Sequence, residues 1–435
     1  MNISFHTLGC KLNFAETSAI ANRFRAAGHT ISERHAGADV LVINTCAVTD
    51  IAEKKCRSAI RQARRNNPDA IIVAAGCFSQ ISPEVLASME EVDIVVGNEH
   101  KYQLVEIIEQ YHKSDKAWID HTNILKTRVF TPGFSLIDRT RTFLKIQDGC
   151  NYGCTYCTIP KARGRSRSGK VSEIVQLVKD LETKGVQEIV LTGVNVGDFG
   201  RPHGENLTSL LQEIVSIKPW LRIRLGSVEP ELLSDEIIRL VADSPCLMPH
   251  FHLPLQSGDD EVLRAMKRKY TTHLFGDRVE KIRELLPDAF IAVDVIAGFP
   301  GESETMFENS LRFIEGLPLS WLHVFTYSER KNTQAITITP KVPPAEIKQR
   351  GKMLQKMADQ KKIAFNQSFI GSTRPVLFES DRHEGMIQGF TDNYIRVLHP
   401  YDADLVNQIK QVRLLEIHPG GVLGILEPEF SHRKT

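Results

Sequence analysis

The sequence predicts an α/β protein in three parts: an N-terminal doubly wound parallel-sheet domain, a central partial (β/α)6 barrel and a small C-terminal β-barrel. Three observations predict this. Short apolar runs alternate with amphipathic stretches over the first 115 residues, the alternation restarts with a longer period from Thr142, and the last 65 residues change to short alternating strands. A length of 435 residues fits about three domains.

The N-terminal domain is predicted over residues 1–115. Four apolar runs have the composition of buried parallel strands, namely Ile3 to Leu8, Asp39 to Asn44, Ala70 to Ala75 and Asp93 to Val96. Helices are expected between and after them, at Asn13 to Ala27, Ala52 to Arg65, Pro83 to Met89 and His100 to Tyr111. This alternation is typical of a doubly wound sheet. Residues 116–135 are polar and irregular, which predicts a linker.

The central barrel is predicted over residues 136–369. Six apolar runs, each followed by a helix-length segment, are its candidate strands: Thr142 to Gln147, Glu188 to Thr192, Arg222 to Gly226, Pro249 to Leu253, Phe290 to Ala297 and Trp321 to Phe325. A Lys-rich helical pattern from Pro344 to Phe369 closes the domain. Barrels of this kind place their active sites at the C-terminal ends of the strands.

The C-terminal domain is predicted over residues 370–435. Its short strands include Pro375-Val-Leu-Phe, Met386-Ile-Gln-Gly-Phe, Tyr394-Ile-Arg-Val-Leu and Val412-Arg-Leu-Leu, separated by turns. This pattern predicts a small β-barrel.

Composition narrows the class of protein. The net charge of +1 averages 54 basic and 53 acidic residues, which argues against a uniformly basic nucleic-acid binder but leaves room for local basic patches. No run approaches 18 apolar residues and the start lacks a signal peptide, so we expect a cytoplasmic protein without membrane contact. In that reducing compartment, the eight cysteines point to metal or redox chemistry rather than to disulfides.

The strongest motif is a C-x3-C-x2-C run, Cys150, Cys154 and Cys157, just past the first barrel strand. Three thiolates can hold three irons of a [4Fe-4S] cluster and leave the fourth iron open to a cofactor or substrate. A structural zinc site is the alternative, but it normally takes four protein ligands, and the sequence offers no fourth Cys or His nearby.

A second cysteine set is spread along the N-terminal domain. Cys10, Cys46 and Cys77 each directly follow a predicted parallel strand, and the loops after such strands share one edge of the sheet. We therefore expect the three thiols to converge on a second three-cysteine [4Fe-4S] cluster. The alternative is that they are buried cysteines acting as small apolar side chains, which is our expectation for Cys56 and Cys246.

Small and polar residues at the ends of the later barrel strands are candidates for seating a nucleoside-like cofactor. Together with Tyr156 of the cysteine motif, the predicted cofactor contacts are Thr192, Gly193, Asn195, Ser227, Glu229, His252, Gln256, Asp294 and Gly298.

With these motifs in order, the chain resembles the methylthiotransferase family of radical S-adenosylmethionine (SAM) enzymes almost end to end. Within that family, the chain is most similar to the branch that acts on threonylcarbamoyladenosine in tRNA. The similar sequence segments begin at Thr7, Asn44, Cys154, Met266 and Gly389. Two positions depart from the usual pattern: Asp259 stands where a small residue is more common, and Arg330-Lys-Asn-Thr replaces Pro-Gly-Thr.

The resemblance implies a TIM-like radical SAM barrel, an N-terminal methylthiotransferase domain and a C-terminal barrel similar to the RNA-binding TRAM module. It implies that SAM binds the cluster of Cys150, Cys154 and Cys157 and yields a 5′-deoxyadenosyl radical that removes hydrogen from adenine C2, with no catalytic side chain beyond the cluster ligands. Sulfur would come from the cluster of Cys10, Cys46 and Cys77, and its methyl group from a second SAM. The implied partners are the tRNA anticodon stem-loop, an electron donor such as flavodoxin or ferredoxin, and a sulfur donor.

The basic run after the cysteine motif is a candidate substrate contact. Arg163, Arg165 and Arg167 could bind phosphate or the threonylcarbamoyl carboxylate through bidentate guanidinium groups, the alternative being a solvated loop. Other functions also stay open: methylthiolation of isopentenyladenosine tRNA or of a ribosomal-protein aspartate, and a non-enzymatic two-cluster electron-transfer or RNA-binding protein.

Overall fold

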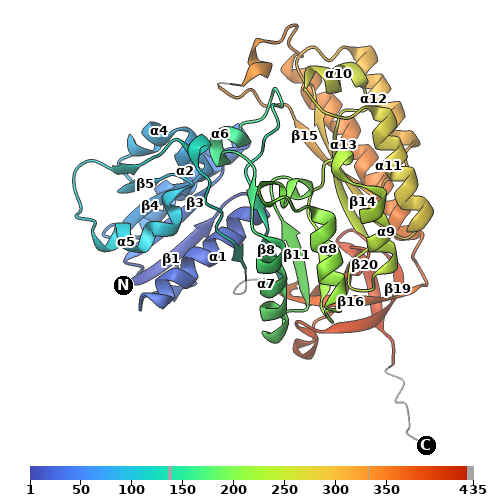
Figure 1. Cartoon of the computed structure of the whole chain (residues 1–435), viewed down its shortest axis with the longest axis horizontal. Helices are drawn as coiled ribbons and strands as arrows, with labels where there is room; N and C mark the ends of the chain where they lie inside the picture. The colour runs from blue at the N-terminus through green and yellow to red at the C-terminus, as the bar shows by residue number, and fades with distance from the viewer. Residues whose placement is uncertain (136–139, 332, 429–435) are drawn as a thin grey trace, which may run out of the picture.

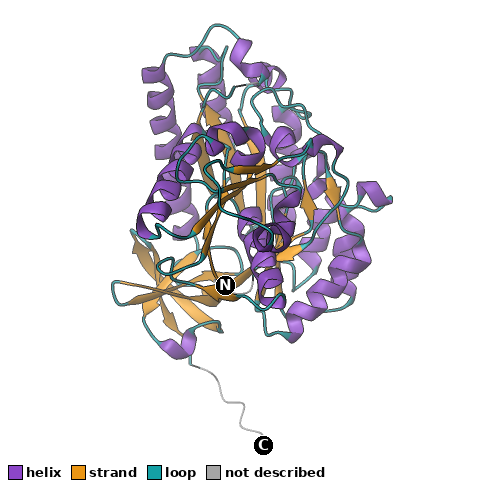
Figure 2. Cartoon of the chain, turned by 90° about the vertical axis from the view of Figure 1, so that its left-hand side faces the viewer, coloured by secondary structure: helices purple, strands orange, loops and turns teal. Residues whose placement is uncertain are grey.

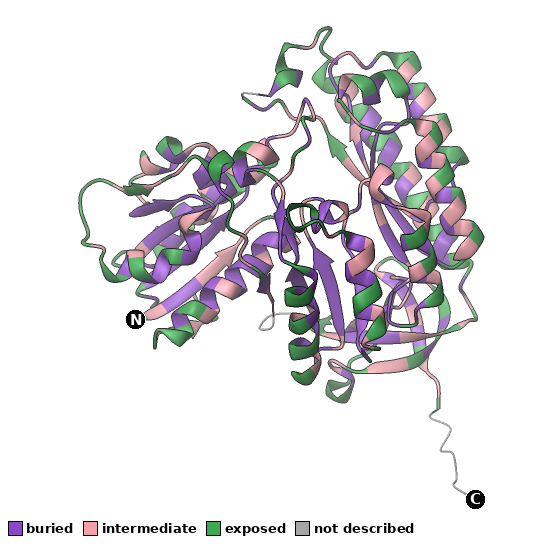
Figure 3. Ribbon diagram, in the orientation of Figure 1, coloured by how far each residue is buried: buried purple, intermediate pink, exposed green. Residues whose placement is uncertain are grey.

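The computed structural model describes residues 1–135, 140–331 and 333–428. The N-terminal domain lies beside the central barrel, and the C-terminal barrel lies beneath it in the view of Figure 1. Strands are buried in both larger domains, while the outer faces of the surrounding helices are exposed (Figure 3). The predicted fold class, three parts of α/β, (β/α) barrel and β-barrel type, is confirmed.

The N-terminal domain is built on a six-stranded parallel sheet in the order β2-β1-β3-β4-β5-β6. The strands are β1 (Asn2–Thr7), β2 (Thr30–Ser32), β3 (Val40–Thr45), β4 (Ile71–Gly76), β5 (Ile94–Val96) and β6 (Trp118–Asp120). Two apolar clusters cover its two faces, which is why the central strands read as continuous apolar runs. The four predicted strands are present.

The helices of this domain begin directly after the strands. They are α1 (Lys11–Ala26), α2 (Asp50–Asn66), α3 (Cys77–Ile81), α4 (Pro83–Ala87), η1 (His100–Gln103) and α5 (Leu104–Glu109). Thr49 caps α2 by accepting a hydrogen bond from Ala52 N at 3.1 Å. Part of the predicted linker, residues 116–135, forms regular structure. Its strand β6 pairs with β5 and completes the sheet. Leu136, where the barrel domain was expected to begin, lies outside the described residues.

The central domain is a partial barrel of six parallel strands in sequence order. They are β8 (Arg141–Lys145), β11 (Glu188–Thr192), β12 (Arg222–Leu225), β13 (His250–Gln256), β14 (Phe290–Ala297) and β15 (Trp321–Thr326). A short strand, β7 (Gly133–Phe134), borders β8. The sheets β12-β11-β8-β7 and β13-β14-β15 meet through two isolated parallel bridges, Ile223 to Leu247 and Ser227 to His252. The outer layer consists of α7 (Val171–Thr183), α8 (Leu207–Ser216), α9 (Asp235–Asp243), α11 (Thr272–Leu285), α12 (Glu304–Gly316) and α13 (Pro344–Gln367).

Helix α1 packs against the edge of this barrel, beside β8 (Figure 1). Its Ala15 is fully buried against Phe143 of β8 and Val190 of β11. Strand β7 is antiparallel to β8, and a Cβ on Gly133 would lie 3.0 Å from the carbonyl oxygen of Ala15. Small residues on both sides thus allow the helix to approach the sheet closely, so the N-terminal domain covers part of the barrel wall.

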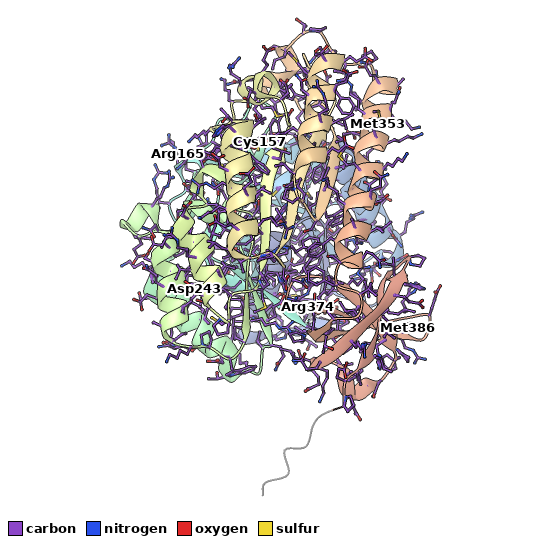
Figure 4. The ribbon with its side chains drawn as sticks, turned by 90° about the vertical axis from the view of Figure 1, so that its right-hand side faces the viewer. Cys157, Arg165, Asp243, Met353, Arg374 and Met386 are labelled. Atoms are coloured by element: carbon purple, nitrogen blue, oxygen red, sulfur yellow. The ribbon has the colours of Figure 1, made fainter. Side chains whose placement is uncertain are left out.

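The C-terminal domain is a closed barrel in the order β16-β17-β18-β20-β19 (Figure 2). Its strands are β16 (Thr373–His383), β17 (Met386–Thr391), β18 (Arg396–Pro400), β19 (Ile409–His418) and β20 (Gly421–Leu426). It shares a core with Phe290 at the start of β14, and its Tyr394 accepts a hydrogen bond from Arg141 at the start of β8. The C-terminal barrel therefore lies at the N-terminal ends of the central barrel's strands. Figure 4 shows its residues Arg374 and Met386 at the opposite end of the molecule from Cys157.

In the described parts of the chain, no helix has both the length and the apolar character needed to cross a membrane.

Candidate active site

A cavity of about 310 Å³ lies at the C-terminal ends of the barrel strands, and Cys150, Cys154 and Cys157 all line it. The three cysteines follow β9 (Gln147–Asp148), a short strand that continues the path of β8. Val48 and Thr49 of the N-terminal domain line the same cavity. The site is therefore built from two domains.

Each sulfur of this motif accepts a hydrogen bond from an N–H donor. Cys150 accepts from Tyr152 N at 3.3 Å, Cys157 accepts from Ile159 N at 3.4 Å, and the Arg268 side chain donates to Cys154 at 3.2 Å. Burial raises the pKa of Cys150 to about 11 and that of Cys157 to about 12. Donors aimed at sulfur favour thiolate ligands, and hydrogen bonds to sulfur are a usual feature of iron–sulfur sites.

Neither cysteine triplet is compact enough to be a ready-made site for a single ion. Among the described residues, one group of three ligand atoms lies within 4.8 Å of one another, and it is His252, Asp294 and His323 rather than either cysteine triplet. Ligands of one zinc ion would need to be that compact, whereas a cubane spreads its thiolates over several irons. The residues present therefore fit a three-cysteine [4Fe-4S] cluster.

Most of the predicted cofactor contacts line the cavity: Tyr156, Asn195, Ser227, Glu229, Gln256 and Asp294. Both polar atoms of the Asn195 amide are buried without a hydrogen-bond partner among the described residues. Gln256 has a φ of 63°, an uncommon conformation for a non-glycine residue, at an irregularity of β13. An unpartnered amide and a locally strained backbone both indicate a site shaped for a ligand.

The other predicted contacts, Thr192, Gly193, His252 and Gly298, do not line the cavity themselves. The Thr192 hydroxyl donates to Val190 O at 3.0 Å, and His252 pairs with Asp294 at 2.8 Å. A Cβ on Gly193 would meet the Gln147 side chain at 2.8 Å, and one on Gly298 would meet Ile347 of α13 at 2.5 Å. These positions support the loops and the barrel wall rather than the cavity surface.

Several cavity residues escaped the sequence prediction: Arg268, Phe325, Tyr327 and Arg330, besides Val48 and Thr49. Arg268 forms an ion pair with Glu229, and Arg330 forms one with Glu53 of α2 and donates to Ala47 O at 2.8 Å. The sequence marked these two arginines only weakly. Arg268 belongs to a run of three basic residues after α10 (Asp260–Ala265), and Arg330 begins the Arg330-Lys-Asn-Thr segment that differs from the usual family pattern.

Glu229 is an unusual carboxylate within this cavity. Burial raises its pKa to about 7; Arg268 opposes the rise, while the nearby charges of Glu231 and Asp294 add to it. Near neutral pH this side chain is thus poised between its neutral and charged forms.

The N-terminal cysteines converge at the edge of the parallel sheet that faces the barrel. Cys10 is exposed at the start of α1, whereas Cys46 and Cys77 are buried. A Cβ on Gly9 would lie 3.0 Å from the Cys46 sulfur, and Asn98 donates to the Cys77 sulfur at 3.6 Å. Burial raises the pKa of Cys46 to about 12, and the neighbouring Cys77 and Cys10 add to the rise. Three neighbouring thiols behind successive strands fit the ligand set of a second cluster.

Two of the three arginines predicted to contact substrate are buried instead. Arg163 is 1% exposed and is held by Glu16, Asp148 and Asn13, and Arg167 binds Asp148 and nearby carbonyl oxygens. The prediction is wrong for them because their guanidinium groups already have partners: Glu16 and Asp148 bind Arg163, while Asp148 and backbone carbonyls bind Arg167. Arg165 is exposed, and with the exposed Arg128 it lines a surface hollow that also contains Cys150.

The two remaining cysteines have protein contacts of their own. Cys56 is fully buried and accepts a hydrogen bond from Cys46 N at 3.3 Å, and Cys246 belongs to the apolar core of the barrel.

Comparison with known proteins agrees with this architecture. Residues 144–314 match the Radical SAM superfamily, and residues 2–97 match the uncharacterized protein family UPF0004. The radical SAM methyltransferase TsrM from Kitasatospora setae, solved with cobalamin and a [4Fe-4S] cluster bound, has a similar fold, with a TM-score of 0.54 at 14% identity over 89% of this chain and 80% of that one.

Sequence relatives extend over nearly the whole chain. The threonylcarbamoyladenosine tRNA methylthiotransferase MtaB of Bacillus subtilis (strain 168) is 38% identical over 99% of this chain and 98% of its own length. The protein of that name from Aquifex aeolicus is also 38% identical, over 91% of this chain and 96% of its own. The chain is thus a member of the radical SAM tRNA methylthiotransferase family, whose radical SAM domain binds a [4Fe-4S] cluster and SAM.

Proposed function

We propose that this enzyme methylthiolates C2 of N6-threonylcarbamoyladenosine next to the anticodon of tRNA, with sulfur delivered from a second [4Fe-4S] cluster on Cys10, Cys46 and Cys77. One observation carries the proposal: the loop that follows Cys46 forms part of the cavity that contains Cys150, Cys154 and Cys157. A target base in that cavity would lie between the two cysteine sets.

The cofactors supply the chemistry that side chains cannot. Cys150, Cys154 and Cys157 would hold the cluster, and with SAM bound the cluster would supply radical chemistry able to remove hydrogen from an adenine carbon that ordinary bases could not deprotonate at useful rates.

The chain's own residues hold the reactants. Asn195 offers an amide donor and acceptor, Glu229 and Asp294 offer carboxylates to the cationic cofactor, and Tyr156 supplies an aromatic wall. The ion pair between Arg330 and Glu53 fixes the N-terminal domain at the rim. These residues bind and orient; proton transfer by a side chain is not required.

The tRNA must present an unstacked base to the cavity, since a paired or stacked base could not enter it. The exposed Arg128 and Arg165 beside Cys150 suit contacts to the phosphates of the anticodon stem-loop. The C-terminal barrel lies at the far end of the strands, so any RNA it holds is distant from the reacting base. An electron donor such as flavodoxin or ferredoxin and a sulfur donor complete the proposal.

A second candidate substrate is isopentenyladenosine in tRNA. A tRNA-2-methylthio-N(6)-dimethylallyladenosine synthase of Desulfotalea psychrophila (strain LSv54 / DSM 12343) is 32% identical over 88% of this chain and 89% of its own length. The MtaB relatives are more similar, which favours the threonylcarbamoyl substrate.

The test combines cluster analysis with defined substrates. Iron, sulfide and Mössbauer spectra of anaerobically reconstituted protein are compared with those of a variant that carries Cys150→Ala, Cys154→Ala and Cys157→Ala. The proposal expects two clusters in the wild type and one in the variant. Anticodon stem-loops bearing each modified adenosine are then assayed by mass spectrometry; turnover of the isopentenyl substrate alone would show that isopentenyladenosine is the substrate, and loss of all iron in the variant would show that Cys10, Cys46 and Cys77 hold no second cluster.

A further inference from the structure

A buried network of charges joins the two cysteine sites. It lies between α1 of the N-terminal domain and the start of the radical SAM motif, and its centre is Arg163. The Arg163 guanidinium donates to Glu16 at 2.9 and 3.0 Å, to Asp148 at 3.0 Å and to Asn13 at 2.6 Å. Two of these partners belong to α1, the helix that begins directly after Cys10, and the third lies two residues before Cys150.

The contacts continue to an N-terminal cysteine sulfur on one side and to the backbone beside Cys150 on the other. Asn13 accepts a hydrogen bond from the Cys10 thiol at 3.8 Å, and Asp148 accepts one from Gly149 N, next to Cys150, at 2.8 Å. A parallel path runs from Lys101 to Asn98 at 2.7 Å and from Asn98 to the Cys77 sulfur at 3.6 Å. One guanidinium is thus linked to the Cys10 sulfur in the N-terminal domain and to the backbone that leads into Cys150 in the barrel.

The network is not electrically balanced. Its cations are Lys101, Lys145, Arg163 and Arg167 and its carboxylates are Glu16 and Asp148, all less than 9% exposed, so that four positive charges face two negative ones. Burial lowers the pKa of Lys101, but one positive charge remains in excess even with Lys101 neutral. Buried charge without a counter-charge is costly, so an anion belongs nearby.

The cysteines are placed to provide that anion. Although burial opposes its charge, the pKa of Arg163 is held well above its usual value by Cys77, Glu16, Asp148 and Cys10. A cluster held by three thiolates carries net negative charge, and it becomes more negative on reduction or when sulfide is added.

We propose that Arg163 is a positioning residue that locks the N-terminal cysteine site against the barrel and provides positive charge to the cluster bound there, which makes that cluster easier to reduce. This inference rests on the proposed second cluster. It gives the buried arginine a role distinct from substrate contact, and it explains why two carboxylates do not neutralise the network.

The charge on each side of the network can be changed by one residue. The test uses full-length protein with Cys150→Ala, Cys154→Ala and Cys157→Ala, so that the remaining EPR signal of the reduced protein belongs to the N-terminal cluster. Its midpoint potential is measured by anaerobic redox titration in this parent and in the added variants Arg163→Met, Glu16→Gln and the Arg163→Met/Glu16→Gln pair.

We expect Arg163→Met to shift the midpoint to more negative potential, Glu16→Gln to shift it to more positive potential, and the pair to lie close to the parent. Arg163→Lys, which keeps the charge but not the fork, should shift it less than Arg163→Met. Arg165→Met, two residues away and exposed, should leave the midpoint unchanged. A merely structural role would not produce shifts of opposite sign.

The outcomes distinguish this inference from the proposed function on which it rests. If the midpoint potentials stay at the parent value, or move in the same direction for both single variants, the role of Arg163 is overturned and the proposed function is not. If Arg163→Met fails to retain iron, Glu16→Gln still carries the test through the sign of its shift. A parent without iron at the N-terminal site would overturn the proposed second cluster and this inference with it.

Discussion

Arg330, in the loop after β15, forms an ion pair with Glu53 of α2 across the boundary between the barrel and the N-terminal domain. The same guanidinium donates to Ala47 O, the carbonyl next to Cys46, at 2.8 Å. The rim of the active-site cavity is thereby tied to the loop that presents an N-terminal cysteine.

Breaking this pair should loosen the domain boundary. Arg330→Met and Glu53→Gln are each expected to lower the temperature of unfolding, and the double variant should lose less than the sum, with a coupling of about 0.5–3 kcal/mol. Differential scanning fluorimetry and denaturant unfolding would measure it. Lys331→Met, at the exposed neighbour, should change little. Strictly additive losses would show that the pair contributes no stability.

Asn195 should matter for cofactor binding and not for folding. Its amide is buried without partners, so Asn195→Ala is expected to weaken SAM binding about tenfold while the free energy of unfolding does not fall. Equilibrium dialysis of reconstituted protein with SAM measures the affinity. Thr192→Val is the control, because that hydroxyl is used by Val190 O. Wild-type affinity in Asn195→Ala would exclude the amide from the cofactor site.

Glu229 should make SAM binding depend on pH near neutrality. With a pKa of about 7, it is about one tenth ionised at pH 6 and about nine tenths at pH 8, and only the carboxylate attracts the cationic cofactor. We expect affinity to rise up to about tenfold over that range. Glu229→Gln should flatten the profile, and a profile that keeps its slope in this variant would point to another group.

The raised pKa of Glu229 also has a consequence for stability. Because folding favours the neutral acid, its contribution to the free energy of unfolding is largest below the unfolded-state pKa near 4.5 and is lost as pH rises towards 7. Urea unfolding of the cluster-free protein at pH 5 and pH 8, beside Glu229→Gln, isolates this contribution; equal pH dependence in both proteins would contradict it.

Arg165 should contribute to tRNA binding through charge. Arg165→Ala is expected to weaken binding of the anticodon stem-loop and to reduce the slope of log affinity against log salt by about 1. Fluorescence anisotropy at several KCl concentrations gives both values. Lys179→Ala, an exposed cation on α7, serves as the matched control. An unchanged salt slope would show that Arg165 is a solvated surface residue that does not contact the tRNA.

Tyr394 should stabilise the protein without taking part in the reaction. Its hydroxyl accepts a hydrogen bond from Arg141 at 3.1 Å, at the end of the central barrel where the strands begin. Tyr394→Ala is therefore expected to lower the free energy of unfolding by about 3–5 kcal/mol. Cleavage of SAM by the folded variant should persist, as measured by 5′-deoxyadenosine formation. Tyr401→Ala, partly exposed on the same domain, should cost far less.

The sequence predicted what depends on local pattern. The buried strands were recognisable because apolar residues fill both of their faces, and the positions of Cys10, Cys46 and Cys77 after such strands were enough to predict their convergence. The strands β2 and β6, three residues each, were missed because they lie at the edges of the sheet and none of their residues is fully buried, so they lack the apolar run that identified the equally short β5.

Long-range pairing could not be predicted in the same way. Arg163 and Arg167 lie in an acid-free run, which indicated an exposed basic loop. Yet Arg163 is bound by Glu16, which is 147 residues away and belongs to another domain, and Arg167 is bound by Asp148, 19 residues before it. Arg330 and Arg268 line the cavity for the same reason: their carboxylate partners lie far away in the chain. Whether a charged side chain is solvated or buried depends on such partners, and one sequence does not display them.

The contact between α1 and the barrel also constrains how the chain is made on the ribosome. The buried Ala15 has its partners in β8 and β11, and the second of these strands ends at Thr192. The N-terminal domain, whose last strand β6 ends at Asp120, therefore leaves the exit tunnel with the apolar contact at Ala15 uncovered. That contact is completed only after about 70 further residues have been synthesised. Until then the nascent chain is a natural client for chaperones that shield apolar surface.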